Sequence, residues 1–210
     1  MIESASDTVQ LLMLAGCFGL SLIRLLRTRS MAWLAVVCFF ACMLLGNAYW
    51  LGYLVVFGET PHVSYVPDLS WIAGYIFLLM LLVEADHHRA PSASVPAAWI
   101  PVAACTACCV YYIAVNGYPL LNIADNGLMA ALGFFAVRGL AAPPSKGFAG
   151  NRALHIAVLV FVVVEQALWM SSLLLPSGPV LAFDPYIALN YILTLSYASI
   201  LACAWRSDGQ

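Results

Sequence analysis

Seven apolar segments, each long enough to cross a lipid bilayer, occupy almost the whole of this sequence. A helix needs about 20 apolar residues to span a hydrocarbon core of about 30 Å. The segments are continuously apolar rather than alternating, which favours helices over the strands of an outer-membrane barrel. We therefore predict an all-α integral membrane protein with a single domain over residues 1–210. The predicted helices cover about 8–26, 31–57, 66–85, 95–115, 119–142, 152–175 and 184–205.

The composition supports a membrane protein and excludes other classes. Hydrophobic residues make up 64% of the chain and charged residues 9%, whereas soluble domains average about 45–50% and about 25%. The net charge is −2 without a basic run, so we expect no nucleic-acid partner. No Gly-x-Ser-x-Gly or P-loop motif occurs, and the only lysine, Lys146, falls in a predicted loop. These absences argue against serine hydrolases, nucleotide hydrolases and a retinal Schiff base, and we expect no cofactor.

The charges predict the orientation of the chain in its membrane. Positive residues concentrate in the cytoplasmic loops of membrane proteins, and all eight lysines and arginines fall on one side of the predicted spans. The other side carries acidic residues only. We therefore expect a multi-pass protein of a bacterial cytoplasmic (inner) membrane, with its N-terminus outside and its C-terminus inside. The eight residues are Arg24, Arg27, Arg29, Arg89, Arg138, Lys146, Arg152 and Arg206.

Spans two and three resemble spans six and seven. The stretch 47–50 and the stretch 166–169 each hold an amide residue followed by a tryptophan three positions later. After the next loop, an aspartate precedes a tyrosine by seven positions in both copies, as Asp68 and Tyr75 and as Asp184 and Tyr191. This pattern predicts a parallel 3+1+3 repeat of about 1–89 and 119–206, with span four as the connector. Chance similarity between apolar helices is the alternative.

Two family resemblances follow from these features. The 3+1+3 layout is similar in topology to the SWEET, PQ-loop and KDEL-receptor group, although the chain lacks a Pro-Gln dipeptide. The stretches 46–50 (GNAYW) and 65–75 (YVPDLSWIAGY) resemble uncharacterised multi-span sensory modules of bacterial signalling proteins. The second resemblance implies a sensory role, because such modules precede diguanylate cyclase or kinase domains. It covers about 30 residues, and Asn47 replaces the aspartate of the Gly-Asp-x-x-Trp pattern that these modules often show.

Glu165 is the leading candidate for a functional residue. It falls near the middle of span six, within the stretch 162–167 (VVVEQA). An ionised residue at this depth costs at least about 2.5–3.5 kcal/mol on insertion scales, and such residues usually mark functional sites. Proton coupling and recognition of a cationic ligand are two functional interpretations. The structural alternative is a neutral glutamic acid that holds neighbouring helices together by hydrogen bonds.

Polar and aromatic side chains fall in the outer halves of several predicted spans. In a helix that starts at Pro119, Asn122, Asp125 and Asn126 share one face. Asp125 then lies about 9 Å below the outer helix end, and Glu165 lies about 15 Å below its own. Apolar and aromatic walls with a few polar groups are typical of a small-ligand site, and an acid beside aromatic rings suits a cationic or amphipathic ligand. The alternative is helix–helix hydrogen bonding with an interfacial aromatic belt. The predicted ligand-binding residues are Asn47, Trp50, Tyr75, Asn122, Asp125, Asn126, Glu165, Gln166, Trp169, Asn190 and Tyr191.

Three aspartates precede apolar spans on the outer side. Asp7, Asp68 and Asp184 are interpreted as helix caps, because a carboxylate at the N-cap accepts the first free backbone N–H groups. Pro185 follows Asp184, as expected at the first position of a helix. An acidic vestibule that attracts cations is the alternative interpretation.

The cysteines and histidines do not predict a metal site. Cys105, Cys108 and Cys109 share a face of span four, where buried cysteines usually act as small hydrophobic residues. His87 and His88 are interpreted as part of a solvated turn, with metal binding as the alternative. No His-x-x-x-His motif occurs, so the ligand set of a membrane zinc hydrolase is incomplete.

These observations leave several functional hypotheses open. The first is a non-enzymatic sensor that binds a small ligand from outside and contacts a cytoplasmic signalling partner, for example through residues 138–152. The second is a proton-coupled transporter with Glu165 as the coupling residue, which the apolar inner halves of the spans disfavour. A third is a lipid-modifying enzyme that uses Glu165 and Asp125 as acid and base. The lipid bilayer is the expected surrounding in each case, and a homodimer is compatible with all of them.

Overall fold

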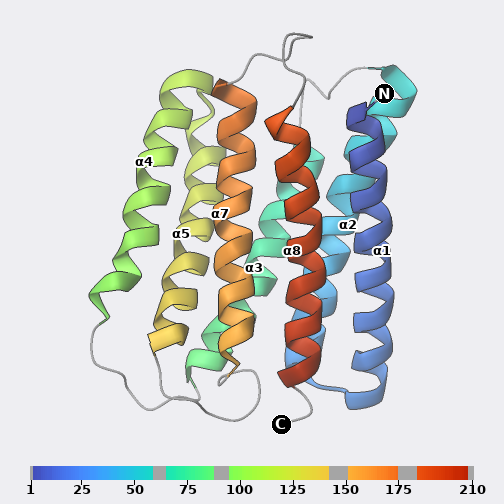
Figure 1. The fold of residues 1–210 in the computed structure, drawn as a ribbon, viewed down its shortest axis with the longest axis vertical. Coiled ribbons are helices and arrows are strands. Elements are labelled where there is room, and N and C mark those ends of the chain that lie inside the picture. Colours follow the sequence, from blue (N-terminus) through green and yellow to red (C-terminus); the bar gives the residue numbers. More distant parts are fainter. Residues whose placement is uncertain (1, 59–64, 88–94, 142–150, 175–183, 208–210) are drawn as a thin grey trace.

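The computed structural model describes residues 2–58, 65–87, 95–141, 151–174 and 184–207, and the secondary structure described there is helical. Seven of the helices are long and apolar enough to cross a membrane, which confirms the predicted fold class. The two termini lie at opposite ends of the bundle, and we call the end with the N-terminus the upper end (Figure 1). The elements are α1 (Ile2–Thr28), α2 (Met31–Phe57), α3 (Tyr65–His87), the short 3-10 helix η1 (Pro96–Ala98), α4 (Trp99–Asn116), α5 (Pro119–Ala141), α7 (Arg152–Leu174) and α8 (Pro185–Ser207).

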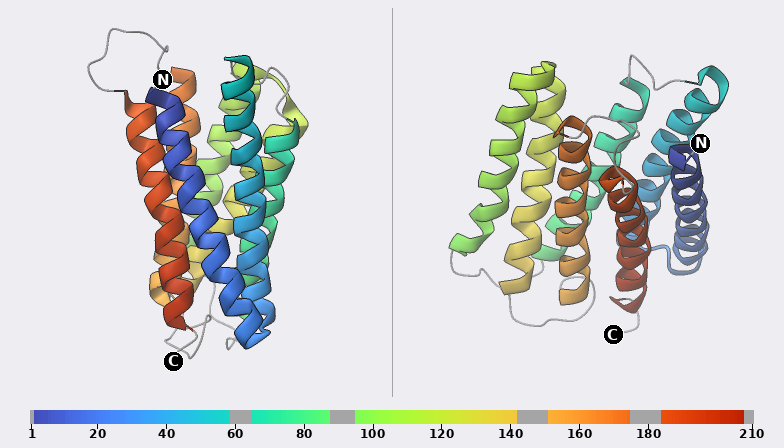
Figure 2. Two further views of the ribbon diagram at one scale, coloured as in Figure 1. Left: turned by 90° about the vertical axis from the view of Figure 1, so that its right-hand side faces the viewer. Right: turned by 45° about the horizontal axis from the view of Figure 1, so that its top comes forward.

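Six of the helices form a closed ring. Going round it, α1 contacts α2, α2 contacts α3, α3 contacts α5, α5 contacts α7, α7 contacts α8, and α8 returns to α1. Helix α4 lies outside this ring against α5, with a smaller contact to α7 (Figures 1 and 2). A two-fold axis along the bundle would exchange α1 with α5, α2 with α7 and α3 with α8. The predicted repeat requires this order, and the repeat itself stays a prediction.

The positive charges of the described chain lie at one end of the bundle. Each described arginine is within five residues of a lower helix end or in the turn between α1 and α2. No lysine or arginine occurs in the described upper halves of the helices. The predicted orientation therefore corresponds to the upper end facing outward. The described arginines are Arg24, Arg27, Arg29, Arg138, Arg152 and Arg206.

Local signals explain where several helices begin and end. Helix α2 stops at Gly58, whose φ of 73° is strained for other residues and whose N–H donates to Leu54 O at 2.9 Å. Gly117 ends α4 with a different ψ but also a positive φ, 75°, and its N–H donates to Ile113 O at 3.1 Å. Asn151 caps α7 by accepting from Leu154 N at 3.2 Å. Its amide also donates to Cys203 O and Ser207 Oγ of α8, each at 2.6 Å, which ties the lower ends of the two helices together.

The capping prediction is confirmed for one aspartate and wrong for two. Asp184 Oδ1 accepts from Tyr186 N at 2.9 Å at the start of α8. Helix α3 begins at Tyr65, so Asp68 lies inside its first turn, where the helix dipole favours an acid. Helix α1 begins at Ile2 rather than near residue 8, so Asp7 lies in its second turn. Tertiary contacts explain this extension, because Asn190 of α8 donates to the side chains of Ser6 and Asp7.

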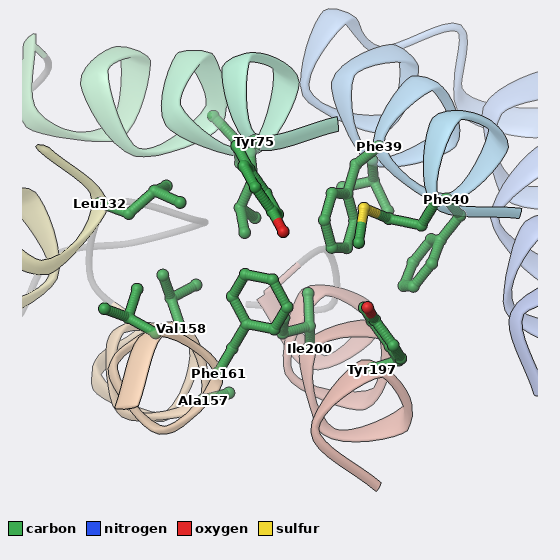
Figure 3. Packing of buried hydrophobic residues seen from close by; sticks show 14 of the residues in the cluster. Phe39, Phe40, Tyr75, Leu132, Ala157, Val158, Phe161, Tyr197 and Ile200 are labelled. Atoms are coloured by element: carbon green, nitrogen blue, oxygen red, sulfur yellow. The ribbon is translucent and has the colours of Figure 1, made fainter. Parts of the chain in front are cut away.

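Aromatic and aliphatic side chains pack in the interior of the ring (Figure 3), and by helix rise Phe39 and Phe161 lie about 12–14 Å above the lower helix ends. Phe39 of α2 packs against Phe161 of α7 and Tyr197 of α8, with ring centroids 6.0 and 6.2 Å apart. Leu132, Val158 and Ile200 are fully buried around them. Helices in a bilayer gain little from apolar burial itself, so close van der Waals packing of this kind holds them together. The interior of the ring below its midpoint is therefore a packed core.

Candidate functional site

The upper half of the ring is centred on Glu165 of α7. This side chain is only 5% exposed. By helix rise it lies about 14 Å below the upper end of α7 and about 20 Å above the lower end. Tyr75 of α3 donates its hydroxyl to Glu165 Oε1 at 2.7 Å, and Trp169 Nε1 donates to the same oxygen at 3.4 Å. Glu165 Oε2 is buried and has no hydrogen-bond partner in the described structure. One oxygen of the carboxyl is thus fixed by two donors, and the other has none.

Three tryptophans lie between Glu165 and the upper end. Trp71 of α3 stands between Trp50 of α2 and Trp169 of α7, with ring centroids 6.0 Å away on each side. Gly46 makes room for this arrangement, because a Cβ there would lie 2.5 Å from Trp71 Nε1. We call Trp50, Trp71 and Trp169 the tryptophan layer. Trp169 connects this layer with the carboxyl through its Nε1.

One aspartate interacts with Glu165, and a second interacts with that aspartate. Asp125 of α5 interacts electrostatically with both Glu165 and Asp68 of α3. These three acids come from α3, α5 and α7, which are consecutive in the ring. The described arginines are all near the lower end. The upper half of the ring therefore concentrates acidic groups without an arginine beside them in the described chain.

Two buried amide side chains accompany the acids. Gln166 is 9% exposed, and neither its Oε1 nor its Nε2 has a hydrogen-bond partner in the described structure. Asn126 of α5 is 2% exposed; its amide donates to Asn122 O at 3.0 Å, while its Oδ1 has no partner. Tyr112 of α4 donates to the backbone oxygen of Gln166 at 3.3 Å, so α4 supports this part of α7 from outside the ring. Native proteins satisfy most buried polar atoms. The clustering of unsatisfied polar atoms in α5 and α7 therefore points to a site.

Four of the predicted binding residues have no described contact with the Glu165 site. Asn190 donates to Ser6 Oγ at 3.2 Å and to Asp7 Oδ1 at 2.9 Å, in the α1–α8 contact across the ring from α3 and α5. Asn47 and Asn122 donate to backbone oxygens close by in sequence, at 2.9 and 2.8 Å. Tyr191 is 42% exposed. The depth predicted from helix rise placed these residues in the upper half of the bundle, but their contacts do not connect them with Glu165.

Two members of the cluster were missed as site residues. Trp71 entered the sequence argument only within the stretch 65–75, although it lies four residues before Tyr75 and so on the same face of α3. Asp68 was interpreted as a cap, although it lies three residues before Trp71 on that same face. A helical wheel of α3 centred on Tyr75 would have found both.

The described residues contain no group of three histidine, cysteine or acidic side chains arranged to hold a metal ion. All seven cysteines are free thiols, and Cys109 donates to Asn122 O at 3.5 Å. The side chains of His87 and His88 lie outside the described part of the chain, so the interpretation of this pair stays a prediction.

No protein-family model, curated protein or solved structure matches this chain. The two family resemblances therefore stay predictions, and an assignment of function has to start from the site around Glu165.

Proposed function

We propose that this chain is a receptor-like membrane protein that binds a small ligand beside Glu165, in the upper half of the six-helix ring. One observation carries the proposal. Glu165 is buried, one of its oxygens accepts from Tyr75 and Trp169, and the other has no partner in the described structure. The surrounding side chains, a tryptophan layer with a few acids and amides, have the character of small-ligand sites.

The competing interpretation is that Glu165 only holds helices together. Hydrogen bonds between membrane helices contribute about 0.6 kcal/mol on average. A buried polar atom left without a partner costs about 1–3 kcal/mol. The Glu165 carboxyl leaves such an atom at Oε2, and Gln166 leaves two more one residue later. A purely structural role explains the bonds to Oε1 but not these neighbours, whereas a ligand with matching groups explains both.

The packing below Glu165 favours sensing over transport. A transported ligand needs a polar path to the lower end, and the ring interior there is filled by Phe39, Phe161 and Tyr197. Binding from the upper end with a shift of helices is compatible with this core. A cytoplasmic signalling partner bound at the lower, arginine-bearing end would then respond to the movement of the helices. In this proposal the upper end faces outward from a cytoplasmic membrane.

A small proton-coupled transporter is the second candidate. The electrostatic interaction of Asp125 with Glu165 across two neighbouring helices favours it, because intramembrane acids that influence each other are used in proton relays. This mechanism requires the two halves of the ring to move around the site. Uptake of a bound ligand into proteoliposomes, driven by a pH gradient, would separate transport from sensing.

Reaction with dicyclohexylcarbodiimide tests whether Glu165 is a reachable site. This reagent reacts with the protonated fraction of a carboxyl within a membrane, so the ligand-free protein is labelled at both acidic and neutral pH, and mass spectrometry identifies the labelled residue. We expect labelling of Glu165 in nanodiscs, loss of the label in Glu165→Gln, and no loss in the control Glu84→Gln, which changes an exposed acid near the lower end. A Glu165 that stays unlabelled while the protein remains folded would contradict the proposal and support a structural role.

A further inference from the structure

We propose that the ligand is a protonated organic amine, which binds through its N–H groups to Glu165 Oε2 and against the tryptophan layer. The inference rests on the proposed function, because it assigns a ligand class to the same site. Three separate observations in the upper half of the ring lead to it: the balance of hydrogen-bonding groups, the sign of the charges and the aromatic surroundings.

The buried groups without partners are mostly acceptors. The amide oxygens Gln166 Oε1 and Asn126 Oδ1 can only accept hydrogen bonds, and so can Glu165 Oε2 when the acid is ionised. Gln166 Nε2 is the single donor group among these atoms. By helix rise all three residues lie about 10–14 Å below the upper ends of α5 and α7, and these two helices are neighbours in the ring. A complementary ligand therefore brings more donors than acceptors. Anions and carbonyl compounds have the opposite balance.

The charges at this depth call for a cation. Asp125 interacts electrostatically with Glu165 and, nearer the upper end, with Asp68. The sequence contains no lysine or arginine between residues 30 and 88 or between residues 153 and 205. The chain therefore supplies neither of these side chains from the upper parts of α2, α3, α7 and α8. A protonated amine adds the missing positive charge and the missing donors in one group.

The aromatic surroundings favour an organic cation over a metal ion. Trp169 donates to the Glu165 carboxyl through Nε1, which places its indole beside the acid. Trp71 lies against Trp169 with centroids 6.0 Å apart. Cations bind well against indole faces, and tryptophan is the best ring for this contact. The described residues meanwhile lack three acidic, histidine or cysteine ligands in metal-binding positions.

Matched small molecules test the ligand class. We would titrate the protein in nanodiscs with ammonium, methylammonium and benzylammonium chloride, and follow tryptophan fluorescence and thermal unfolding. Benzyl alcohol is the neutral counterpart of benzylammonium, benzyltrimethylammonium lacks N–H donors, and sodium chloride controls for inorganic cations. We expect saturable binding of at least one protonated amine, with benzyl alcohol and benzyltrimethylammonium each at least tenfold weaker. Glu165→Gln should weaken amine binding at least tenfold, and Glu84→Gln should leave it unchanged.

Several outcomes would overturn the inference. Equal binding of benzylammonium and benzyl alcohol would show an apolar site in which the charge has no role. A sodium shift equal to the amine shift would assign the site to an inorganic cation, and no response to any of the amines would reject the class. Carbodiimide labelling distinguishes these failures from failure of the proposed function: a labelled Glu165 without amine preference rejects the amine alone, whereas an unlabelled Glu165 rejects both.

Discussion

Tyr75 and Glu165 join two helices that are not neighbours in the ring. Tyr75 lies on α3 and Glu165 on α7, with α5 between these helices on that side of the ring, and the hydroxyl and carboxyl meet at 2.7 Å. The bond therefore crosses the interior instead of following the wall. It connects the predicted first half of the chain with the predicted second half at the depth of the proposed site.

Removing the Tyr75 hydroxyl should weaken the bundle measurably. We expect Tyr75→Phe to lower the free energy of unfolding by about 1–2 kcal/mol, because a buried hydrogen bond to a carboxyl is lost while the ring remains. Reversible unfolding in mixed micelles measures the change. Tyr191→Phe is the matched control, since Tyr191 is 42% exposed. Equal effects of the two substitutions would show that the Tyr75 bond contributes nothing to stability.

Gly46 should tolerate no side chain. A Cβ at this position would lie 2.5 Å from Trp71 Nε1, so Gly46→Ala should displace the indole and cost about 1–3 kcal/mol by overpacking. The tryptophan emission spectrum should shift as the layer rearranges. Gly52→Ala changes the same helix where nothing lies within 4 Å of the added carbon, and we expect neutral or increased stability there. Wild-type emission and stability in Gly46→Ala would contradict the described position of Trp71.

Asn190 should support the start of α1 and leave the Glu165 site intact. Asn190→Ala removes the donor to Ser6 Oγ and Asp7 Oδ1, and loss of these buried bonds should cost about 1–3 kcal/mol. Hydrogen exchange should speed up in the first turns of α1, while carbodiimide labelling of Glu165 stays unchanged. Ser199→Ala, at an exposed position of α8, serves as the control. A change in Glu165 labelling would show that Asn190 contributes to the Glu165 site.

The C-terminus should face the cytoplasm. A green fluorescent protein fused after residue 210 folds in the cytoplasm, so the fusion should fluoresce, and an alkaline phosphatase fused at the same point should be inactive. The physical reason is the position of the described arginines at the lower helix ends. Replacing Arg24, Arg27 and Arg29 with glutamine should reduce this preference, whereas Glu84→Gln should not. An active phosphatase fusion of the wild type would reverse the predicted orientation.

The sequence predicted the features that are local along the chain. The seven spans follow from the length and hydropathy of each segment, and Glu165 stands out because an acid interrupts an apolar run. Trp50 and Trp169 were found through their spacing from an amide residue. Each of these signals lies within one or two helical turns, so sequence reasoning could reach it.

The features that the sequence did not predict depend on contacts between segments that are far apart along the chain. Asn190 and Asp7 are 183 positions apart, and no local pattern indicates that α1 and α8 meet. The same limit applies to Asp68: it shares a face of α3 with Trp71, but its interaction with Asp125 of α5 exists only once the two helices are packed together. Trp71 shares a face of α3 with Tyr75, but its ring contacts with Trp50 and Trp169 could be recognised only in the packed bundle.

Helix α4, which lies outside the ring, sets the number of crossings between the two predicted halves. Each predicted half contributes three crossings, so the first half ends at the lower end while the second must begin at the upper end. Helix α4 supplies the odd crossing that turns an antiparallel pair of halves into a parallel one. Without it, Arg138, Arg152 and Arg206 would move to the upper end, opposite Arg24, Arg27 and Arg29. A helix with no place in the ring thereby keeps the charge of both halves on one face of the membrane.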